Sequence, residues 1–507
     1  MISKIDKLGS TLIESVRRFS SAELLLAINS VVKNKPNKNE GPIDIQSFHF
    51  IAAVLASFAI RCSNPHRQEG RTVSQADFKR LFDIAFAFVS ADPITFDEQI
   101  EGEFKNSNPV FALLRIISSQ FPFEKNYFGF IGQTLLLYDK LPKEIDGNKG
   151  IPSFDFAYAF RNITGLSVRD FVNIGFVAWT GSESTTTRGL TRNYFEIARL
   201  HGMKLPDDDG VLQLMNCLSA DPVRFRNRYE EMKQKDRRYR MYDFNPLFSY
   251  PIIRPWSGSH NRQMSMDRMV APLPHLVAYR ISTGIYYEMF NYYKEAFSSY
   301  FGHLFEAYVG QLLRGSVKPK SLIAEADVRL TYPTAKGKAP DWIVLDGSTA
   351  ILIECKATRF SLAAQSTGAV EAVDNSLKQV VSGLKQLYEF MQALTNKTRG
   401  LEHLNNFTVI HPLLVSFEPL FLINTELFRK HVNGLLETEG IPDFPWRIMS
   451  VKELESFQPH LEAGISFAHI LSELKSERHN DVLAECKTMT NKTYKDCMLY
   501  KYDQEMY

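Results

Sequence analysis

The stretch of sequence that decides the fold of the second half of the chain is residues 339–356, Ala-Pro-Asp-Trp-Ile-Val-Leu-Asp-Gly-Ser-Thr-Ala-Ile-Leu-Ile-Glu-Cys-Lys. Two apolar runs in it, Trp342–Leu345 and Ala350–Glu354, are typical of buried strands. Asp346-Gly347 lies between them and is a strong hairpin-turn signal. We therefore expect two adjacent antiparallel strands here.

The charged residues of this stretch fall where burial is expected. Residues two apart on a strand point to the same face, so Glu354 and Lys356 project together and Cys355 points to the other face. The hairpin brings Asp341 alongside them. Unpaired buried charge is costly, and a bound metal ion offsets that cost. Carboxylates suit Mg²⁺, and a neighbouring lysine can neutralise charge on a phosphate, so this pattern favours phosphodiester chemistry.

The flanking segments predict a compact α/β domain with a mixed central sheet. The expected order is α-β-β-β-α-β-α-β. Its helices and strands are a long or broken helix at 281–313, strands at Leu322–Leu330, Trp342–Leu345 and Ala350–Glu354, a helix at Gly368–Leu394, a strand at Phe407–Phe417, a helix at Thr425–Leu436 and a strand at Trp446–Ser450.

Pro340-Asp341 followed by Glu354-Cys355-Lys356 resembles the PD-(D/E)XK, or restriction-endonuclease-like, nuclease superfamily, whose core has the same order of elements. The resemblance covers about residues 296–420, or 296–455 when the last strand is included. It implies a Mg²⁺-dependent nuclease, with Mn²⁺ able to substitute. Asp341, Glu354 and Lys356 would be catalytic, and Asp341 and Glu354 would bind the metal.

The same resemblance extends to two neighbouring helices. The family often carries a glutamate on the helix before the first strand, and Glu306 occupies the matching place as a further metal ligand. The alternative is a solvated helix residue. The helix after the Glu-x-Lys strand often carries a residue that faces the site. Gln379 and Gln386, seven apart on one helix face, are both candidates, against a plain surface helix as the alternative.

The rest of the chain has mostly helical apolar spacing. Residues 1–280 are expected to form a mainly helical recognition or regulatory region, with a break between two subdomains near 220–245. The nuclease-like domain spans 281–455, and 456–507 form a helical C-terminal extension. The fold class is thus a largely α-helical N-terminal region followed by a restriction-endonuclease-like α/β domain.

A basic run with interleaved aromatic residues lies near the predicted break. Its arginines could follow phosphates while its rings stack on unpaired bases. The alternative is a solvated helix with internal ion pairs through Glu230, Glu231 and Asp236. The candidate nucleic-acid-binding residues are Arg224, Arg226, Arg228, Arg237, Arg238 and Arg240.

Composition excludes several classes. The 507 residues carry a formal net charge of only +2, so any contact with nucleic acid must come from a local patch. The five cysteines form no Cys-x-x-Cys pair, which indicates a reducing, cytoplasmic setting. The N-terminus lacks a signal-peptide pattern, and the longest apolar run, Phe48–Ile60, is too short to span a membrane.

The function expected from these features is metal-dependent hydrolysis of nucleic acid, with DNA favoured over RNA. A helical region fused to such a nuclease suggests, by analogy of domain layout, a prokaryotic effector against phage or plasmid DNA. Its trigger would come from a partner protein or from a homo-oligomer. The alternatives are a nucleic-acid- or partner-binding protein with an inactive nuclease fold, and a site-specific restriction endonuclease.

Overall fold

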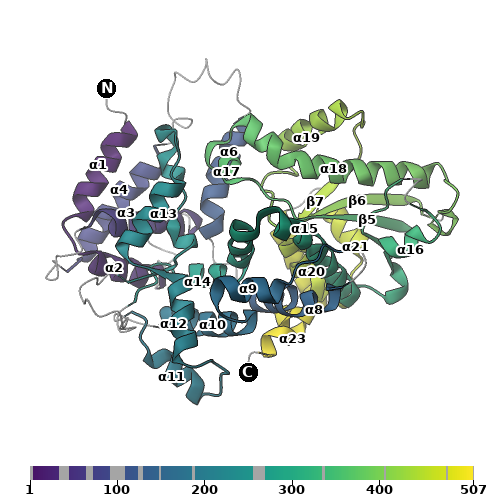
Figure 1. The fold of residues 1–507 in the computed structure, drawn as a ribbon. Coiled ribbons are helices and arrows are strands. Elements are labelled where there is room, and N and C mark those ends of the chain that lie inside the picture. Colours follow the sequence, from purple (N-terminus) through teal and green to yellow (C-terminus); the bar gives the residue numbers. More distant parts are fainter. Residues whose placement is uncertain are drawn as a thin grey trace.

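The structure is a computed structural model of the 507-residue chain. It describes residues 4–33, 45–63, 72–91, 109–123, 129–147, 150–184, 189–254, 269–333, 337–404, 407–474 and 478–505. A helical half and an α/β half lie side by side (Figure 1). No helix in these ranges is both long and apolar enough to cross a membrane.

The first half is built from helices that follow the expected apolar spacing. They are α1 (Lys4–Val16), α2 (Ser21–Lys33), α3 (Ile45–Cys62), α4 (Gln75–Val89), α6 (Pro109–Gln120), α7 (Phe130–Leu135), α8 (Leu141–Ile145), α9 (Phe156–Thr164), α10 (Val168–Ser184), α11 (Asn193–Leu200), α12 (Asp208–Leu218), α13 (Pro222–Met232) and α14 (His275–Arg280). A two-stranded parallel sheet pairs β1 (Ser219–Ala220) with β2 (Ile252–Ile253).

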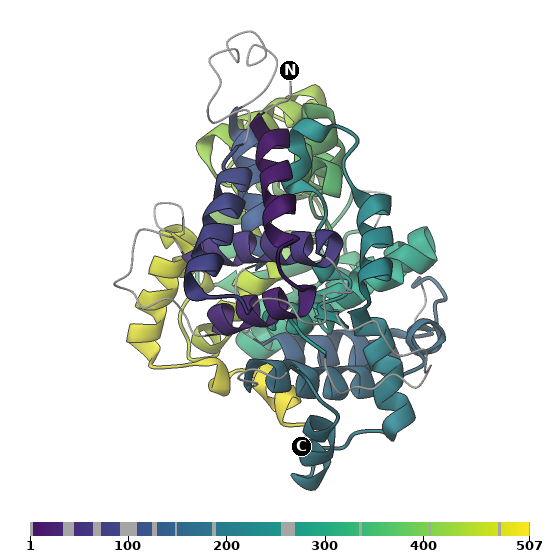
Figure 2. The same ribbon diagram turned by 90° about the vertical axis from the view of Figure 1, so that its left-hand side faces the viewer.

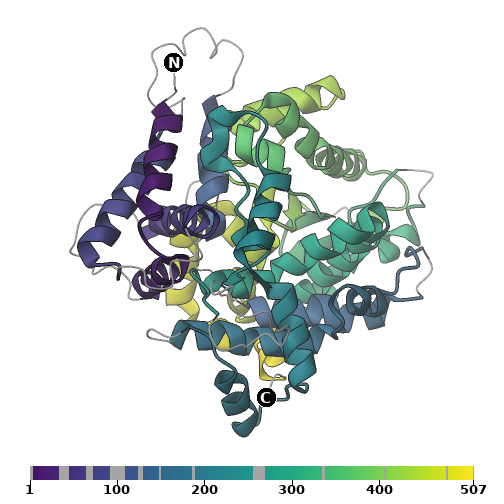
Figure 3. The ribbon, with the colours of Figure 1, turned by 60° about the vertical axis from the view of Figure 1, so that its left-hand side comes forward.

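Two apolar cores hold most of this helical half, and the first takes residues on both sides of the segment 131–218. The first core joins α1–α4 to Ala220, Phe225 and other residues as far as Leu276. Figures 2 and 3 show α1–α4 gathered on one side of the molecule. The second core joins α7–α12, as far as Leu218, to the central sheet and the C-terminal helices. The helical residues 131–218 therefore pack directly on the α/β half.

The α/β half contains the predicted mixed sheet of five strands in the order β3-β4-β5-β6-β7. Its strands are β3 (Leu322–Ala324), β4 (Trp342–Asp346), β5 (Thr349–Lys356), β6 (Val409–Ser416) and β7 (Arg447–Ser450). The strands β3, β4 and β5 pair antiparallel, and β5, β6 and β7 pair parallel. Gly347, at a φ of +62°, begins the two-residue turn of the predicted β4–β5 hairpin.

Helices cover both faces of this sheet (Figure 1). One face packs on α18 and α19, and the other packs on α15 and α20. The helices of this half and of the C-terminal extension are α15 (Thr283–Ser316), α16 (Glu325–Arg329), α17 (Leu362–Thr367), α18 (Val370–Thr395), α19 (Glu426–Thr438), α20 (Val451–Glu462), α21 (Phe467–Glu473), α22 (His479–Thr490) and α23 (Met498–Gln504). The long first helix is broken at Lys294, which has a φ of +47°.

The predicted strand Leu322–Leu330 is wrong beyond Ala324. The chain instead turns into α16 at Glu325. Asp327 Oδ2 accepts a hydrogen bond from Ala324 N at 3.2 Å, and Arg329 pairs with Glu325 at 2.7 Å, four residues earlier. Local side-chain contacts of this kind stabilise a helical turn, and they outweigh the strand-like composition here.

A buried carboxylate ties three helices of the two halves together. Glu455 on α20 is 1% exposed, and its Oε1 accepts hydrogen bonds from Gln133 on α7 at 2.8 Å and from Tyr308 on α15 at 2.7 Å. Burial raises the pKa of Glu455 to about 7, although both hydrogen bonds lower it. The protonated form of the Glu455 carboxyl is therefore more favoured in the folded chain than in the unfolded chain.

Glu455 should make stability fall as the pH rises. Between its ordinary pKa of 4.5 and about 7, the folded state keeps a proton that the unfolded state releases, so the free energy of unfolding decreases across this window. Glu455→Gln removes the titration. We expect the variant to gain up to about 3 kcal/mol over the wild type at about pH 8, and little at about pH 5. Urea denaturation at both pH values measures this, with exposed Glu437→Gln as the control. Equal pH profiles for the wild type and Glu455→Gln would contradict it.

Candidate active site

Three carboxylates lie in one row across the antiparallel part of the sheet. The register that pairs Ala324 with Trp342 and Trp342 with Ile353 places Glu325, Asp341 and Glu354 side by side, one position beyond those pairs. Glu325 N donates to Asp341 O at 2.9 Å, which continues the ladder past β3. Directly opposed like charges repel, so the row is costly unless something offsets it.

The predicted central residues are brought together on the face that packs on α18. Lys356 Nζ donates to Glu354 Oε1 at 2.6 Å. Asp341 Oδ2 accepts a hydrogen bond from Cys355 N at 2.6 Å. Cys355 itself packs against the core on the opposite face. The two-residue alternation predicted for this strand is therefore confirmed.

Burial and mutual repulsion set the electrostatics of the site. Burial raises the pKa of Glu354, 3% exposed, to about 8, and Asp341 raises it further while Lys356 opposes the change. Burial likewise raises the pKa of Asp341 to about 6, against the Cys355 amide and Lys356. The pKa of Lys356 is raised, because Glu354 and Asp341 outweigh its burial. The carboxyls of Asp341, Glu354 and Glu306 thus all have raised pKa values, and each would gain from a nearby cation.

Glu306 approaches this row from α15. Its backbone oxygen accepts a hydrogen bond from Trp342 Nε1 at 3.3 Å, which fixes the helix next to the start of β4. Burial raises the pKa of the Glu306 carboxyl to about 8, with Asp341 and Glu325 adding to the effect. Its side chain is 34% exposed, so it lies at the rim of the site and not in the core.

Of the two glutamines considered on α18, Gln386 lies at the site and Gln379 does not. The Gln386 amide, oriented to satisfy both neighbours, donates to Glu354 and accepts from Lys338 Nζ at 2.7 Å. Its terminal amide also lies 3.3 Å from Lys356 Nζ. Gln379 is exposed, and none of the hydrogen bonds between described residues joins it to the site.

A glycine on the same helix makes room for the lysine. A Cβ atom at Gly383 would lie 3.1 Å from Lys356 Cε and 2.8 Å from Leu414 Cδ1. The Lys356 side chain therefore runs along the helix surface to reach Glu354, a path that a larger residue at this position would narrow.

Sequence reasoning missed Glu325 and Lys338. Glu325 belongs to the stretch predicted as the strand Leu322–Leu330, and nothing in the sequence connected its side chain with Asp341 or Glu354. Lys338 is only three residues from Asp341, and the proximity of a cation to Pro340-Asp341 could have suggested it. Both reach the site only because β3 and the segment before β4 lie beside the β4–β5 hairpin.

The arginines of the basic run lie on α13 and the turn after it, and they contact the protein itself. Arg228 pairs with Glu231 at 3.2 Å, Arg237 with Asp243 at 3.1 Å, and Arg240 with Asp6 at 2.9 Å. Arg224 donates to Asn216 O at 2.8 Å, and Arg226 to Pro222 O at 3.1 Å. The Arg238 side chain lies outside the described residues. Ion pairing within the run, the alternative above, is present at Glu231, and at Glu230, which pairs with Lys233.

The donor set suits a hard divalent cation such as Mg²⁺, which prefers carboxylate oxygens. Glu354 Oε2 is buried and has no hydrogen-bond partner among the described residues. Within the same residues, no three His, Cys, Asp or Glu side chains are grouped closely enough to hold a metal ion. Asp341 accepts a hydrogen bond from the Cys355 amide, and Glu354 accepts one from Lys356, so each carboxylate is bound by a neighbouring donor. The residues therefore fit the ion by the chemistry of their oxygens and by the unsatisfied Glu354 oxygen, and not by an arrangement of three described carboxylates around one point.

Comparisons of the chain with protein-family models, curated proteins and solved structures found no match. The likeness to the PD-(D/E)XK superfamily therefore rests on Asp341, Glu354 and Lys356 and on the order of the elements around them.

Proposed function

We propose that this protein is a Mg²⁺-dependent nuclease that hydrolyses phosphodiester bonds, with DNA as the favoured substrate. The observation that carries the proposal is the buried Glu354, which shares one strand face with Lys356 and lies in register with Asp341. Directly opposed carboxylates repel one another, and a cation would offset the repulsion that Lys356 and the Cys355 amide offset only in part.

Each residue has a distinct task in this proposal. Asp341 and Glu354 would hold the metal ion, and Glu306 would add a third carboxylate from α15. Lys356 offsets the negative charge that develops on the phosphate. Lys338 donates to the Gln386 amide, which in turn donates to Glu354 and holds that side chain in place. The metal ion, when bound, supplies Lewis-acid activation of the phosphodiester.

The test is a cleavage assay with the purified full chain. Plasmid, single-stranded DNA and RNA are each incubated with Mg²⁺, Mn²⁺ or EDTA. We expect cleavage of DNA with Mg²⁺, retained with Mn²⁺ and abolished by EDTA. Discrete plasmid fragments in place of a smear would identify a site-specific endonuclease.

The same assay separates the proposal from its main competitor, a binding protein that keeps an inactive nuclease fold. Electrophoretic mobility shifts measured beside it report binding. Nucleic acid that is shifted but never cut, with either metal, would overturn the nuclease assignment. The role in defence against phage or plasmid DNA stays a prediction from domain layout.

A further inference from the structure

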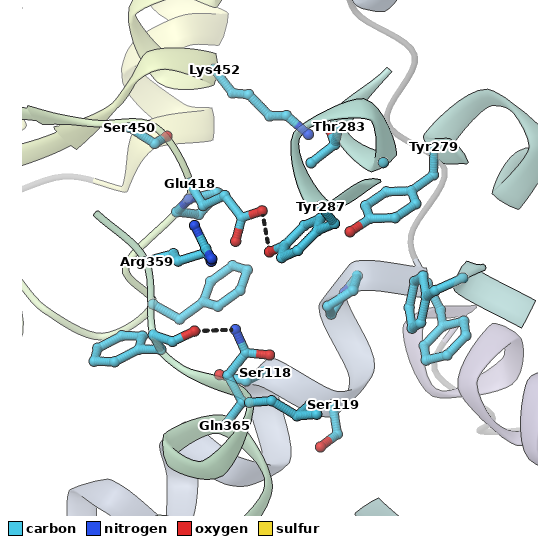
Figure 4. A pocket seen from close by; sticks show the side chains of 18 of the residues that line it. Ser118, Ser119, Tyr279, Thr283, Tyr287, Arg359, Gln365, Glu418, Ser450 and Lys452 are labelled. Atoms are coloured by element: carbon cyan, nitrogen blue, oxygen red, sulfur yellow. Dashed lines mark hydrogen bonds between the residues drawn. The ribbon is translucent and has the colours of Figure 1, made fainter. Parts of the chain in front are cut away.

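A large cavity lies at the carboxyl edge of the parallel strands, and its lining does not include Glu325, Asp341 or Glu354. Because β5, β6 and β7 run parallel, the segments after them meet at one edge, and Arg359, Glu418 and Ser450 line the cavity there. Helices from the first half close the other side, with Ser118 of α6 and Tyr279 of α14. Figure 4 shows these side chains converging on one space. In open α/β sheets this edge is the usual place for a ligand.

The cavity has an excess of positive charge. Lysines and arginines outnumber aspartates and glutamates by eleven to five among its described lining residues. Arg228 and Arg240 are paired with acidic residues outside the lining, and the positive charge that remains favours an anion. Two of its acidic groups are already held: Glu418 accepts a hydrogen bond from Tyr287 at 2.6 Å, and Glu288 pairs with Arg280 at 2.5 Å. Lys452 reaches into the cavity toward Thr283 (Figure 4).

The Arg359 guanidinium is held by aromatic rings. Its central carbon lies 4.4 Å from the ring centroid of Tyr286, 5.1 Å from that of Tyr287 and 5.0 Å from that of Phe290. These contacts fix the planar group while it lines the cavity. A guanidinium fixed in this way recognises phosphate oxygens through two parallel hydrogen bonds.

Two helices begin at the cavity. Thr283 and Lys452, which line it, lie in the first turns of α15 and α20. Ser450 and Glu453 cap the start of α20, whereas no side chain among the described residues caps α15, whose amino end carries partial positive charge. An independent observation points to the same space. Ser118, 4% exposed, lines the cavity, and its Oγ has no hydrogen-bond partner among the described residues. A buried hydroxyl without a partner is costly unless a ligand supplies one.

We propose that this cavity binds a nucleotide. Its phosphates contact Arg359 and Lys452 and lie before the amino end of α15. The base is taken up by aromatic rings that line the same cavity, among them Tyr279 and Phe248. The site is independent of the proposed nuclease chemistry, because none of Asp341, Glu354 and Lys356 lines the cavity.

The test is equilibrium binding of ATP, GTP, CTP and UTP to the full chain by isothermal titration calorimetry. All titrations contain EDTA and are repeated with Asp341→Asn, so that the outcome does not depend on metal or on cleavage. We expect one of the four to bind at one site per chain. Arg359→Gln and Lys452→Gln should each weaken it about tenfold or more, because each removes a charged phosphate contact. Lys430→Gln, an exposed charge change on α19 outside the cavity, should leave the affinity unchanged.

Three results would overturn the proposal. The first is that none of the four nucleotides binds the wild type. The second is that both cavity variants bind the nucleotide as tightly as the wild type does. The third is a single-stranded oligonucleotide that displaces the nucleotide and is itself weakened by both variants, since the cavity would then be a substrate channel. Arg359 is packed among three rings, and a loss of folding there would be visible by circular dichroism. Lys452→Gln then decides the outcome alone.

Discussion

Replacing Asp341 with Asn is expected to lower Mg²⁺-dependent cleavage by on the order of 10³-fold, because a metal ligand contributes several kcal/mol of transition-state stabilisation. The folded structure should persist. An Asn side chain has the same shape as Asp and still offers an oxygen to the Cys355 amide, 2.6 Å away in the wild type. Glu354→Gln should lose cleavage and keep its fold in the same way, because the side-chain oxygen of Gln can still accept the hydrogen bond from Lys356.

The same two variants should be at least as stable as the wild type when metal is absent. The pKa of Asp341 is raised to about 6 and that of Glu354 to about 8, so ionising either group costs stability above its unfolded pKa. Removing the charge removes that cost at about pH 8. Initial rates with Mg²⁺ and thermal denaturation in EDTA measure the two effects, with the exposed Glu437→Gln as the matched control. Unchanged cleavage by both variants would remove these residues from the site.

The second large effect is expected at Trp342, the residue that holds the site to α15. Its ring lies directly over Gly310, where an added Cβ would be 2.1 Å from Trp342 Cζ2, and Arg314 lies 4.9 Å from its ring centroid. The side chain is 5% exposed. Trp342→Ala should cost about 3–5 kcal/mol of unfolding free energy, through the cavity that it leaves between β4 and the helix.

Trp342→Phe is the matched control for this prediction. It keeps most of the ring contact with Gly310 but loses the hydrogen bond from Nε1 to Glu306 O, which is worth about 1 kcal/mol. Chemical denaturation followed by far-ultraviolet circular dichroism measures both variants. A cost below about 1 kcal/mol for Trp342→Ala would show that β4 does not depend on this contact.

Much of the α/β half could be predicted because its signals are local. The β4–β5 hairpin follows from two apolar runs around Asp346-Gly347, and the observed strands extend the predicted ones by a few residues. The α18 helix and strands β6 and β7 lie where periodicity placed them. The strand predicted at Leu322–Leu330 is wrong beyond Ala324 although its composition is strand-like. Other local contacts, those of Asp327 and of the Glu325–Arg329 pair, stabilise a turn of helix at Glu325.

What the sequence by itself determined is the pairing of Glu354 with Lys356 and the approach of Asp341, because strand alternation and a two-residue turn fix these three positions locally. Only the tertiary structure decided which further residues join them. Glu325, Lys338 and Gln386 arrive from separate elements, whose register and packing depend on burying apolar faces far apart in the chain. It also decided the cavity, since Ser118, Arg359 and Lys452 belong to segments that meet only where the helical half closes over the ends of the parallel strands.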